Sequence, residues 1–138
     1  MHKLLSCFIL VLIILGSTGC ELPREENVKN QDISKLSISV SKGFCGLNED
    51  YFMNIEDTEK LERIRNLLND VKKQKRSDEK PQYDLLITYQ NGDTHGIHLY
   101  LGGAGEKSVI MYIGHEETAY YTSEEMTKQL RKIIIKKD

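Results

Sequence analysis

Residues 83–102, YDLLITYQNGDTHGIHLYLG, form the segment that decides the fold. Two strand-like runs flank Asn91-Gly92, and Asn-Gly readily takes the two positive-φ positions of a type I′ turn, whose twist matches that of a β-hairpin. The apolar residues of each run fall on one side of a strand because they are two positions apart. These residues are Tyr83, Leu85, Ile87 and Tyr89 in the first run, and Ile97, Leu99 and Leu101 in the second. The segment therefore predicts an antiparallel hairpin.

The sequence before the hairpin predicts two strands and a helix. Residues 35–41, KLSISVS, alternate strictly and indicate a half-buried strand, and residues 51–55, YFMNI, indicate a short second strand. Residues 57–76 carry an apolar stripe at helical spacing, which Asp57 or Thr58 can cap. We interpret the basic cluster that follows as a solvated helix end, and contact with anionic lipid or cell-wall polymer is the alternative. The cluster contains Lys72, Lys73, Lys75 and Arg76.

The sequence after the hairpin predicts two further strands and a final helix. The strands are expected in residues 108–114, SVIMYIG, and 118–123, TAYYTS, and Thr122 with Glu125 fits a capping box that opens the helix. The helix would bury Met126, Leu130, Ile133 and Ile134. The predicted order is β-β-α-β-β-β-β-α. This order is typical of a single small α+β domain with a mainly antiparallel sheet of about five to six strands and two helices.

The amino-terminal segment predicts export from the cytoplasm. Residues 4–15 are apolar except for one serine, and this run is shorter than the roughly 17–25 residues of a membrane-spanning helix. A positive start at Lys3 and small residues after the run are typical of a secretory signal peptide. The ending at Cys20 resembles the lipobox of bacterial lipoproteins, although Ser17 stands where that motif favours leucine. The resemblance implies a diacylglyceryl group on the Cys20 sulfur and cleavage before Cys20. An ordinary signal peptide or a short membrane anchor is the alternative.

These features divide the chain into a cleaved lipoprotein signal peptide (1–19), a flexible polar tether (20–33) and a globular domain (34–138). We expect the protein on the outer face of the cytoplasmic membrane, held by a lipid anchor on Cys20. Cys45 is then the remaining thiol outside the signal peptide and the lipidation site, so an internal disulfide is not expected. No cationic residue or histidine stands beside Cys45 to activate it, and we interpret it as a passive, partly buried thiol.

Three segments resemble the YhfM-like domain of small lipoproteins from Gram-positive bacteria. They are ISVSKGFCGLNED (38–50), PQYDLLITYQNGDTHGIHLYLG (81–102) and YYTSEEMTKQLRKII (120–134), and the resemblance covers about residues 35–135. The family often shows tryptophan where Tyr100 stands here. The resemblance implies a fold and an extracytoplasmic location, and it implies no activity.

Side chains with catalytic or ligand-binding chemistry show no recognised spacing. His95 and His98 are three residues apart and lie on opposite faces of a strand, and no His-Glu-x-x-His pattern is present, so we expect neither a metal nor a cofactor. The loop GGAGE (102–106) is rich enough in glycine to cradle an anion, but it lacks the lysine of a P-loop and is interpreted as a hairpin loop. Four acidic residues offer a carboxylate pair, although no pattern places two of them across a cleft: Asp84, Asp93, Glu116 and Glu117.

The candidate binding surface consists of Tyr100, Tyr112 and His98. If the apolar rows of their strands face the helices, the two tyrosines lie on the outer face of the sheet near His98. The alternative is that the rings pack on one another. A net charge of −2 gives no attraction to nucleic acid. We therefore predict a non-enzymatic binding or accessory module with an unidentified protein or cell-wall partner. A small cell-envelope hydrolase or ligand-processing enzyme, with a site assembled only in three dimensions, is the alternative.

Overall fold

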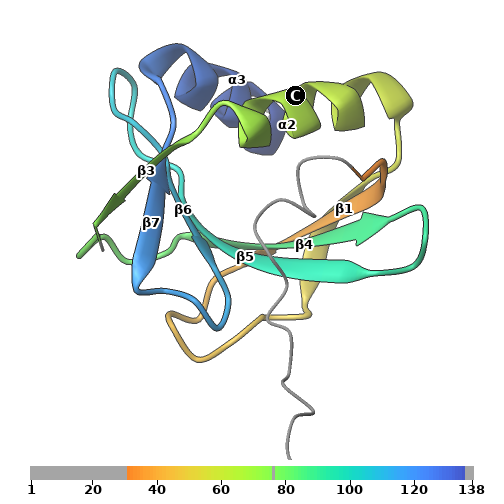
Figure 1. The fold of residues 1–138 in the computed structure, drawn as a ribbon, viewed down its shortest axis with the longest axis horizontal. Coiled ribbons are helices and arrows are strands. Elements are labelled where there is room, and N and C mark those ends of the chain that lie inside the picture. Colours follow the sequence, from red (N-terminus) through yellow and green to blue (C-terminus); the bar gives the residue numbers. More distant parts are fainter. Residues whose placement is uncertain (1–30, 76, 136–138) are drawn as a thin grey trace, which may run out of the picture.

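The computed structural model describes residues 31–75 and 77–135 (Figure 1). The predicted signal peptide and most of the predicted tether lie outside this part of the chain. Among the described residues, no helix is long and apolar enough to cross a membrane. The elements are β1 (Ile33–Val40), β2 (Tyr51–Ile55), α2 (Thr58–Asn69), β3 (Lys72–Lys75), β4 (Tyr83–Tyr89), β5 (Thr94–Tyr100), β6 (Val109–Tyr112), β7 (Thr118–Tyr121) and α3 (Glu124–Ile134).

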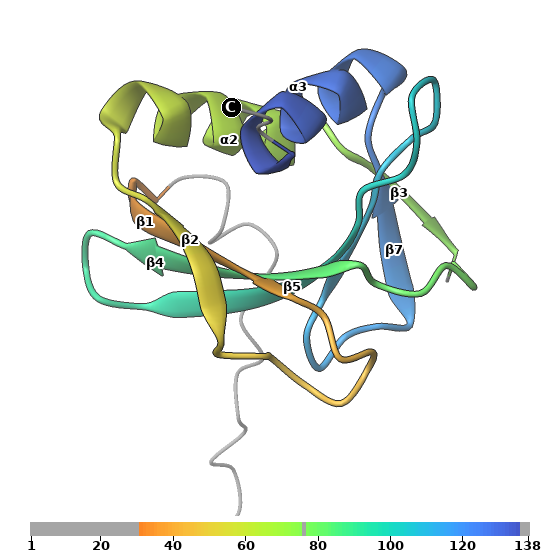
Figure 2. The same cartoon turned by 180° about the vertical axis from the view of Figure 1, so that it is seen from behind.

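The strands form one seven-stranded antiparallel sheet in the order β2-β1-β4-β5-β6-β7-β3. Both helices lie on the same face of the sheet, while the β1–β2 loop and the β6–β7 turn lie on the side away from them (Figures 1 and 2). The predicted α+β class with an antiparallel sheet and two helices is confirmed. The described residues contain one strand more than predicted, because β3 follows α2.

The basic segment after α2 is a strand and not the end of a helix. Helix α2 ends at Asn69, and Lys72–Lys75 pair with β7 at the edge of the sheet, with all four side chains exposed. The apolar stripe of α2 is complete at Leu68, so a longer helix would bury no further surface. Lysines on an edge strand also discourage pairing with another chain. The interpretation of this cluster as a helix end is therefore wrong.

The central hairpin forms as predicted, but its turn is of another type. Gly92 has a positive φ of 90°, whereas no non-glycine residue described here does, so Asn91 does not take part in a type I′ turn. The Gly92 N–H donates to the Tyr89 carbonyl, and the Tyr89 N–H donates to the Asp93 carbonyl. This is the pattern of a three-residue loop in which glycine forms a bulge after a type I turn.

The core lies between the helices and one face of the sheet. Helix α2 contributes its predicted apolar stripe. Every second residue of the central strands faces the helices, and Ile38 of β1, Leu85 of β4 and Ile97 of β5 are at most 3% exposed. Helix α3 begins one residue later than the predicted capping box, because Ser123 rather than Thr122 accepts the Met126 N–H. The helix-side core consists of Leu36, Ile38, Ile64, Leu68, Leu85, Ile87, Ile97, Leu99, Ile110, Leu130 and their buried neighbours.

A cluster of buried hydroxyl groups joins α3 to the strand β6. The Ser108 N–H lies 2.7 Å from the Thr127 Oγ1 and 2.9 Å from the Thr122 Oγ1, and the two threonine hydroxyls are 2.8 Å apart. All three residues are at most 3% exposed. Thr122 is therefore used to satisfy a buried backbone donor, which explains why the neighbouring serine caps the helix.

Candidate functional site

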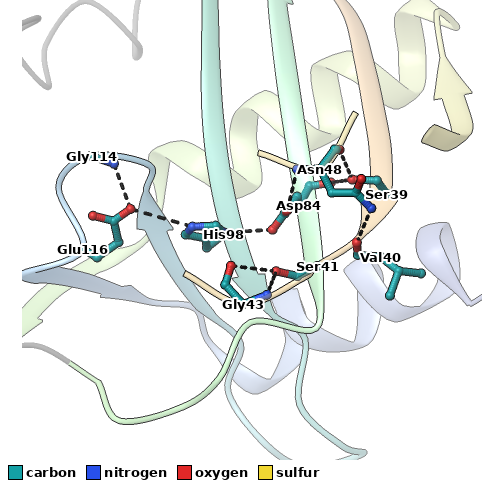
Figure 3. Close-up of polar contacts among 9 residues, drawn as sticks. All are labelled: Ser39, Val40, Ser41, Gly43, Asn48, Asp84, His98, Gly114 and Glu116. Atoms are coloured by element: carbon teal, nitrogen blue, oxygen red, sulfur yellow. Dashed lines mark hydrogen bonds and ion pairs between the residues drawn. The ribbon is translucent and has the colours of Figure 1, made fainter. Parts of the chain in front are cut away.

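A row of buried side chains crosses the sheet face opposite the helices. Asp84 of β4 is the cross-strand partner of Ser39 on one side and of His98 on the other, and His98 in turn pairs with Met111. Cross-strand partners project from the same face of a sheet. All four residues are 0% exposed. The sheet thus holds a carboxylate and an imidazole side by side, away from bulk water (Figure 3).

The carboxylate of Asp84 fixes the orientation of the histidine. The Asp84 Oδ1 lies 2.8 Å from the His98 Nδ1, and the Asp84 Oδ2 accepts the Asn48 N–H at 2.9 Å. An ionised carboxylate can only accept hydrogen bonds, so beside an ionised Asp84 a neutral imidazole holds its proton on Nδ1. The Nε2 atom then carries the free lone pair, which is the arrangement that a general base requires.

The Nε2 atom of His98 is buried and has no hydrogen-bond partner among the described residues. The Glu116 Oε1 forms an ion-pair contact with the His98 Nε2 at a distance of 3.7 Å. The same oxygen accepts a hydrogen bond from the Gly114 N–H at 2.8 Å. Figure 3 shows the imidazole between Asp84 and Glu116. An imidazolium formed here would lie between the two carboxylates.

The loop between β1 and β2 covers this site. The Phe44 ring meets the His98 ring edge to face, with centroids 5.6 Å apart and planes at 86°. The return of the loop is tied to the sheet, because the Ser39 hydroxyl donates to the Asn48 carbonyl and the Asn48 side-chain amide donates to the Val40 carbonyl. Cys45 follows Phe44 and is exposed, so the expectation of a partly buried thiol is wrong.

Tyr51 adds a second buried polar group on the same face. It is the cross-strand partner of Ser39, and its hydroxyl is buried with no hydrogen-bond partner among the described residues. Burial raises the pKa of the Tyr51 phenol, and the negative charges of Glu49 and Asp84 add to the increase. The neutral phenol can therefore serve as a hydrogen-bond donor over a wide range of pH.

The predicted surface of Tyr100, Tyr112 and His98 does not form. Tyr100 lies on the outer face and donates to Glu106 at 3.2 Å, but Tyr112 is the partner of Ile97 and faces the helices, where its ring contacts Tyr120. His98 does share the face of Tyr100 but is fully buried. The register of β6 is the physical reason, because it places Val109 and Met111, rather than Tyr112, on the outer face.

The other predicted candidates lie apart from this site. His95 faces the helix side, where its ring is 5.4 Å from that of Tyr89, and burial lowers its pKa despite the opposing effect of Asp93. The glycine-rich loop binds its own carboxylate, because the Gly103 N–H donates to Glu106 at 2.6 Å. Within the described ranges, no group of three His, Cys, Asp or Glu side chains is placed to hold a metal ion.

Sequence reasoning missed the pairing of Asp84 with His98, although the sequence contains a signal for it. Both residues are polar positions in otherwise apolar runs, and both have the parity opposite to the core row. They lie at equal distances from Asn91, the centre of the observed three-residue loop, which makes them partners, whereas the predicted two-residue turn would have paired Asp84 with Leu99. Glu116 gives no such signal, because the β6–β7 turn brings it to the site.

Two comparisons relate this chain to known proteins. The structure of a thioesterase-like protein from Clostridium sporogenes ATCC 15579 is similar at a TM-score of 0.65 and 20% sequence identity, over 76% of this chain and 96% of that chain. No curated protein matches. The prediction that the chain is not an enzyme is contradicted by this likeness, since the fold is shared with a protein described as thioesterase-like. At this level of identity the likeness establishes the fold.

The sequence model described as YhfM protein matches residues 29–138, which include the whole described domain. The match spans the hairpin that carries Asp84 and His98, the loop above them and the turn that carries Glu116. The resemblance of the domain to the YhfM family is thereby confirmed, and the chain belongs to the YhfM protein family.

Proposed function

We propose that this protein is a small hydrolase that cleaves acyl thioesters or esters, with His98 as the general base. The observation that carries the proposal is the buried Asp84–His98 pair, in which one ring nitrogen is bound at 2.8 Å and the other is left without a hydrogen-bond partner. A buried polar atom without a partner costs about 1–3 kcal/mol, so its presence calls for an explanation such as a catalytic role. The likeness to a thioesterase-like protein supports the choice of reaction.

In the proposed reaction, the His98 Nε2 removes a proton from a water molecule as the water oxygen attacks the carbonyl carbon of the substrate. The imidazolium that forms is stabilised by Asp84 at Nδ1 and by the charge of Glu116 near Nε2. The tetrahedral intermediate collapses, the bond from carbon to sulfur or to the ester oxygen breaks, and the imidazolium returns its proton to the leaving group. The products are a carboxylic acid and a thiol or an alcohol.

The test is hydrolysis of acyl thioesters by the purified full chain, followed through release of the free thiol. General base catalysis contributes about 10²–10⁴-fold, so His98→Gln should lower kcat/KM by a factor in this range. His115→Gln is the matched control, because His115 is partly exposed and its contact is with Glu117. The proposal fails if neither thioesters nor esters are cleaved, or if His98→Gln retains full activity.

We also propose that the protein acts outside the cell, anchored to the cytoplasmic membrane by a lipid on Cys20. The short apolar run of residues 4–15 and the small residues before Cys20 support this proposal. Its substrate or partner would then be a protein or cell-wall component at the membrane surface. Mass spectrometry of the membrane-extracted protein should find an acylated Cys20 at the amino terminus. A Cys20→Ala variant that remains in the membrane fraction and is processed normally would contradict the proposal.

A further inference from the structure

The tip of the β1–β2 loop is built differently from its base. Gly43 and Gly46 have φ angles of 92° and 88°, a region that favours glycine, and they flank Phe44 and Cys45. A Cβ atom added at either glycine would meet nothing within 4 Å. The two positions therefore favour glycine because of their positive φ angles, and not because a side chain would lack space.

The hydrogen bonds between the loop and the sheet lie at the two ends of the loop, and at its start the Ser41 N–H donates to the Gln82 carbonyl at 3.0 Å. Asn48 is held by Asp84, Ser39 and Val40, as described above. The tip is held by a contact within the loop itself, in which the Gly43 N–H donates to the Ser41 hydroxyl at 3.2 Å. A segment with few contacts to the rest of the fold opens at low cost, while a base bound to Asp84 stays in place.

Phe44 is the part of the tip that touches the site. Its ring contacts the His98 imidazole, yet Phe44 remains 42% exposed, so it buries only part of its apolar surface in this position. The strand beside His98 continues the apolar environment on this face. Val109, Met111 and Ala119 form a small buried cluster there, bordered by Tyr100 and Tyr121.

We infer that the Gly43–Gly46 tip is a lid and that Phe44 occupies the position that the substrate's acyl group takes when the lid lifts. This inference rests on the proposed hydrolase function. A position over the imidazole that holds a phenyl ring suits an apolar group, while the carboxylates of Asp84 and Glu116 disfavour an anionic one. The substrate class is therefore an ester or thioester with an apolar acyl group.

The lid is tested without any substrate by modifying histidines of the full chain with diethyl pyrocarbonate and mapping the labelled peptides. This reagent attacks an unprotonated ring nitrogen, and His115, which is partly exposed, serves as an internal reference. Loss of one aromatic contact changes the equilibrium between the closed and the open lid by about twofold to tenfold. Phe44→Ala should therefore raise the labelling of His98 relative to His115 by this factor.

Phe52→Ala is the matched control for this experiment. The exposed fraction of Phe52, 51%, is similar to the 42% of Phe44. The Phe52 ring, however, faces Tyr83 rather than His98. We expect Phe52→Ala to leave the labelling of His98 unchanged. If Phe44→Ala leaves it unchanged as well, or if both variants raise it equally, Phe44 is not the cover and the lid is overturned.

The acyl position is tested by comparing octanoyl and succinyl thioesters, whose acyl groups are apolar and anionic, respectively. We expect a higher kcat/KM for the octanoyl substrate, and Phe44→Trp, which enlarges the ring in the same position, should raise KM for it. Equal rates for the two substrates would overturn the acyl assignment while leaving the hydrolase function intact. Cleavage of neither would refute the hydrolase function and the acyl assignment together, and the labelling result would still decide whether the lid exists.

Discussion

Replacement of Asp84 is the most informative perturbation of the fold, because this one carboxylate accepts hydrogen bonds from the buried His98 ring and from the partly buried Asn48 N–H. Asp84→Ala removes the acceptor of the Asn48 N–H at 2.9 Å and of the His98 Nδ1 at 2.8 Å. A buried donor left without a partner costs about 1–3 kcal/mol, so the two together should lower the free energy of unfolding by about 2–6 kcal/mol. Domains of this size are stable by only about 5–15 kcal/mol, so this loss is large.

Asp84→Asn separates stability from activity. The amide oxygen can still accept from Asn48, while the amide nitrogen can only donate toward the His98 Nδ1. The imidazole must then place its own proton on Nε2, which removes the lone pair required of a base. We expect Asp84→Asn to lose less stability than Asp84→Ala, by about one unsatisfied donor or about 1–3 kcal/mol, and still to lose the hydrolytic activity of the proposed reaction.

Urea denaturation followed by far-ultraviolet circular dichroism measures these differences, and the tyrosines supply fluorescence in a chain without tryptophan. With a urea m-value of about 1.5 kcal/mol per M, a loss of about 2–6 kcal/mol lowers the midpoint by about 1.3–4 M. Asp50→Ala is the control, since the Asp50 carboxylate is exposed and pairs with Lys42, and such a pair contributes at most about 1 kcal/mol. The reasoning is refuted if Asp84→Ala and Asp50→Ala shift the midpoint equally.

Three further predictions concern stability. Thr127→Val leaves the buried Ser108 N–H with one acceptor instead of two and should lower the free energy of unfolding by about 1 kcal/mol, measured by urea denaturation. The Gly103 N–H, with Tyr100 and Arg131, lowers the pKa of Glu106 below its ordinary 4.5. Glu106→Gln should therefore destabilise the domain above pH 4.5. The difference in stability between this variant and the wild type should vanish as the pH falls through the lowered pKa. Burial lowers the pKa of His95, so the unfolded state takes up the proton first as the pH falls below 6.5; His95→Gln should remove the resulting loss of thermal stability.

Exposed residues of the same types provide the controls for these three predictions. Thr94→Val on β5 should change stability by less than about 0.5 kcal/mol. Glu62→Gln on α2 should show no comparable dependence on pH, and His115→Gln serves the same purpose for His95. A Glu106→Gln difference that grows as the pH falls would contradict the sign worked out above, as would a His95→Gln variant that loses stability below pH 6.5 in parallel with the wild type.

The hairpin that carries the site could be predicted because its signals are local. The apolar rows of its two strands place Asp84 and His98 on the same face, but the predicted two-residue turn would have paired Asp84 with Leu99, and the observed three-residue loop makes His98 its partner. The approach of Glu116 to His98 could not be predicted in this way, since it depends on how the β6–β7 turn lies relative to β5. Contacts of this kind follow from the packing of the whole sheet, and no pattern within a strand records them.

Two errors in the predicted sheet have a common physical origin, which is that tertiary contacts decide what local patterns leave open. Val109, Ile110 and Met111 are all at most 3% exposed, so β6 is apolar on both faces and its alternation cannot assign a side to Tyr112. The Lys72–Lys75 segment is polar throughout and suits a helix or an edge strand equally. Pairing with β7 supplies backbone hydrogen bonds that settle the choice.

Stability alone does not account for the buried pair of Asp84 and His98. Removing two polar partners from water costs free energy that their attraction only partly offsets, and apolar residues of similar volume are often as stable in such a position. The His98 Nε2 is buried without a hydrogen-bond partner and lies 3.7 Å from the Glu116 Oε1, while Asp84 uses both of its oxygens. The fold thus fixes one nitrogen of the ring by a short hydrogen bond, and the other lies beneath a glycine-flanked loop with only the longer contact to Glu116. A substrate or water molecule that enters under Phe44 would supply the missing hydrogen-bond partner.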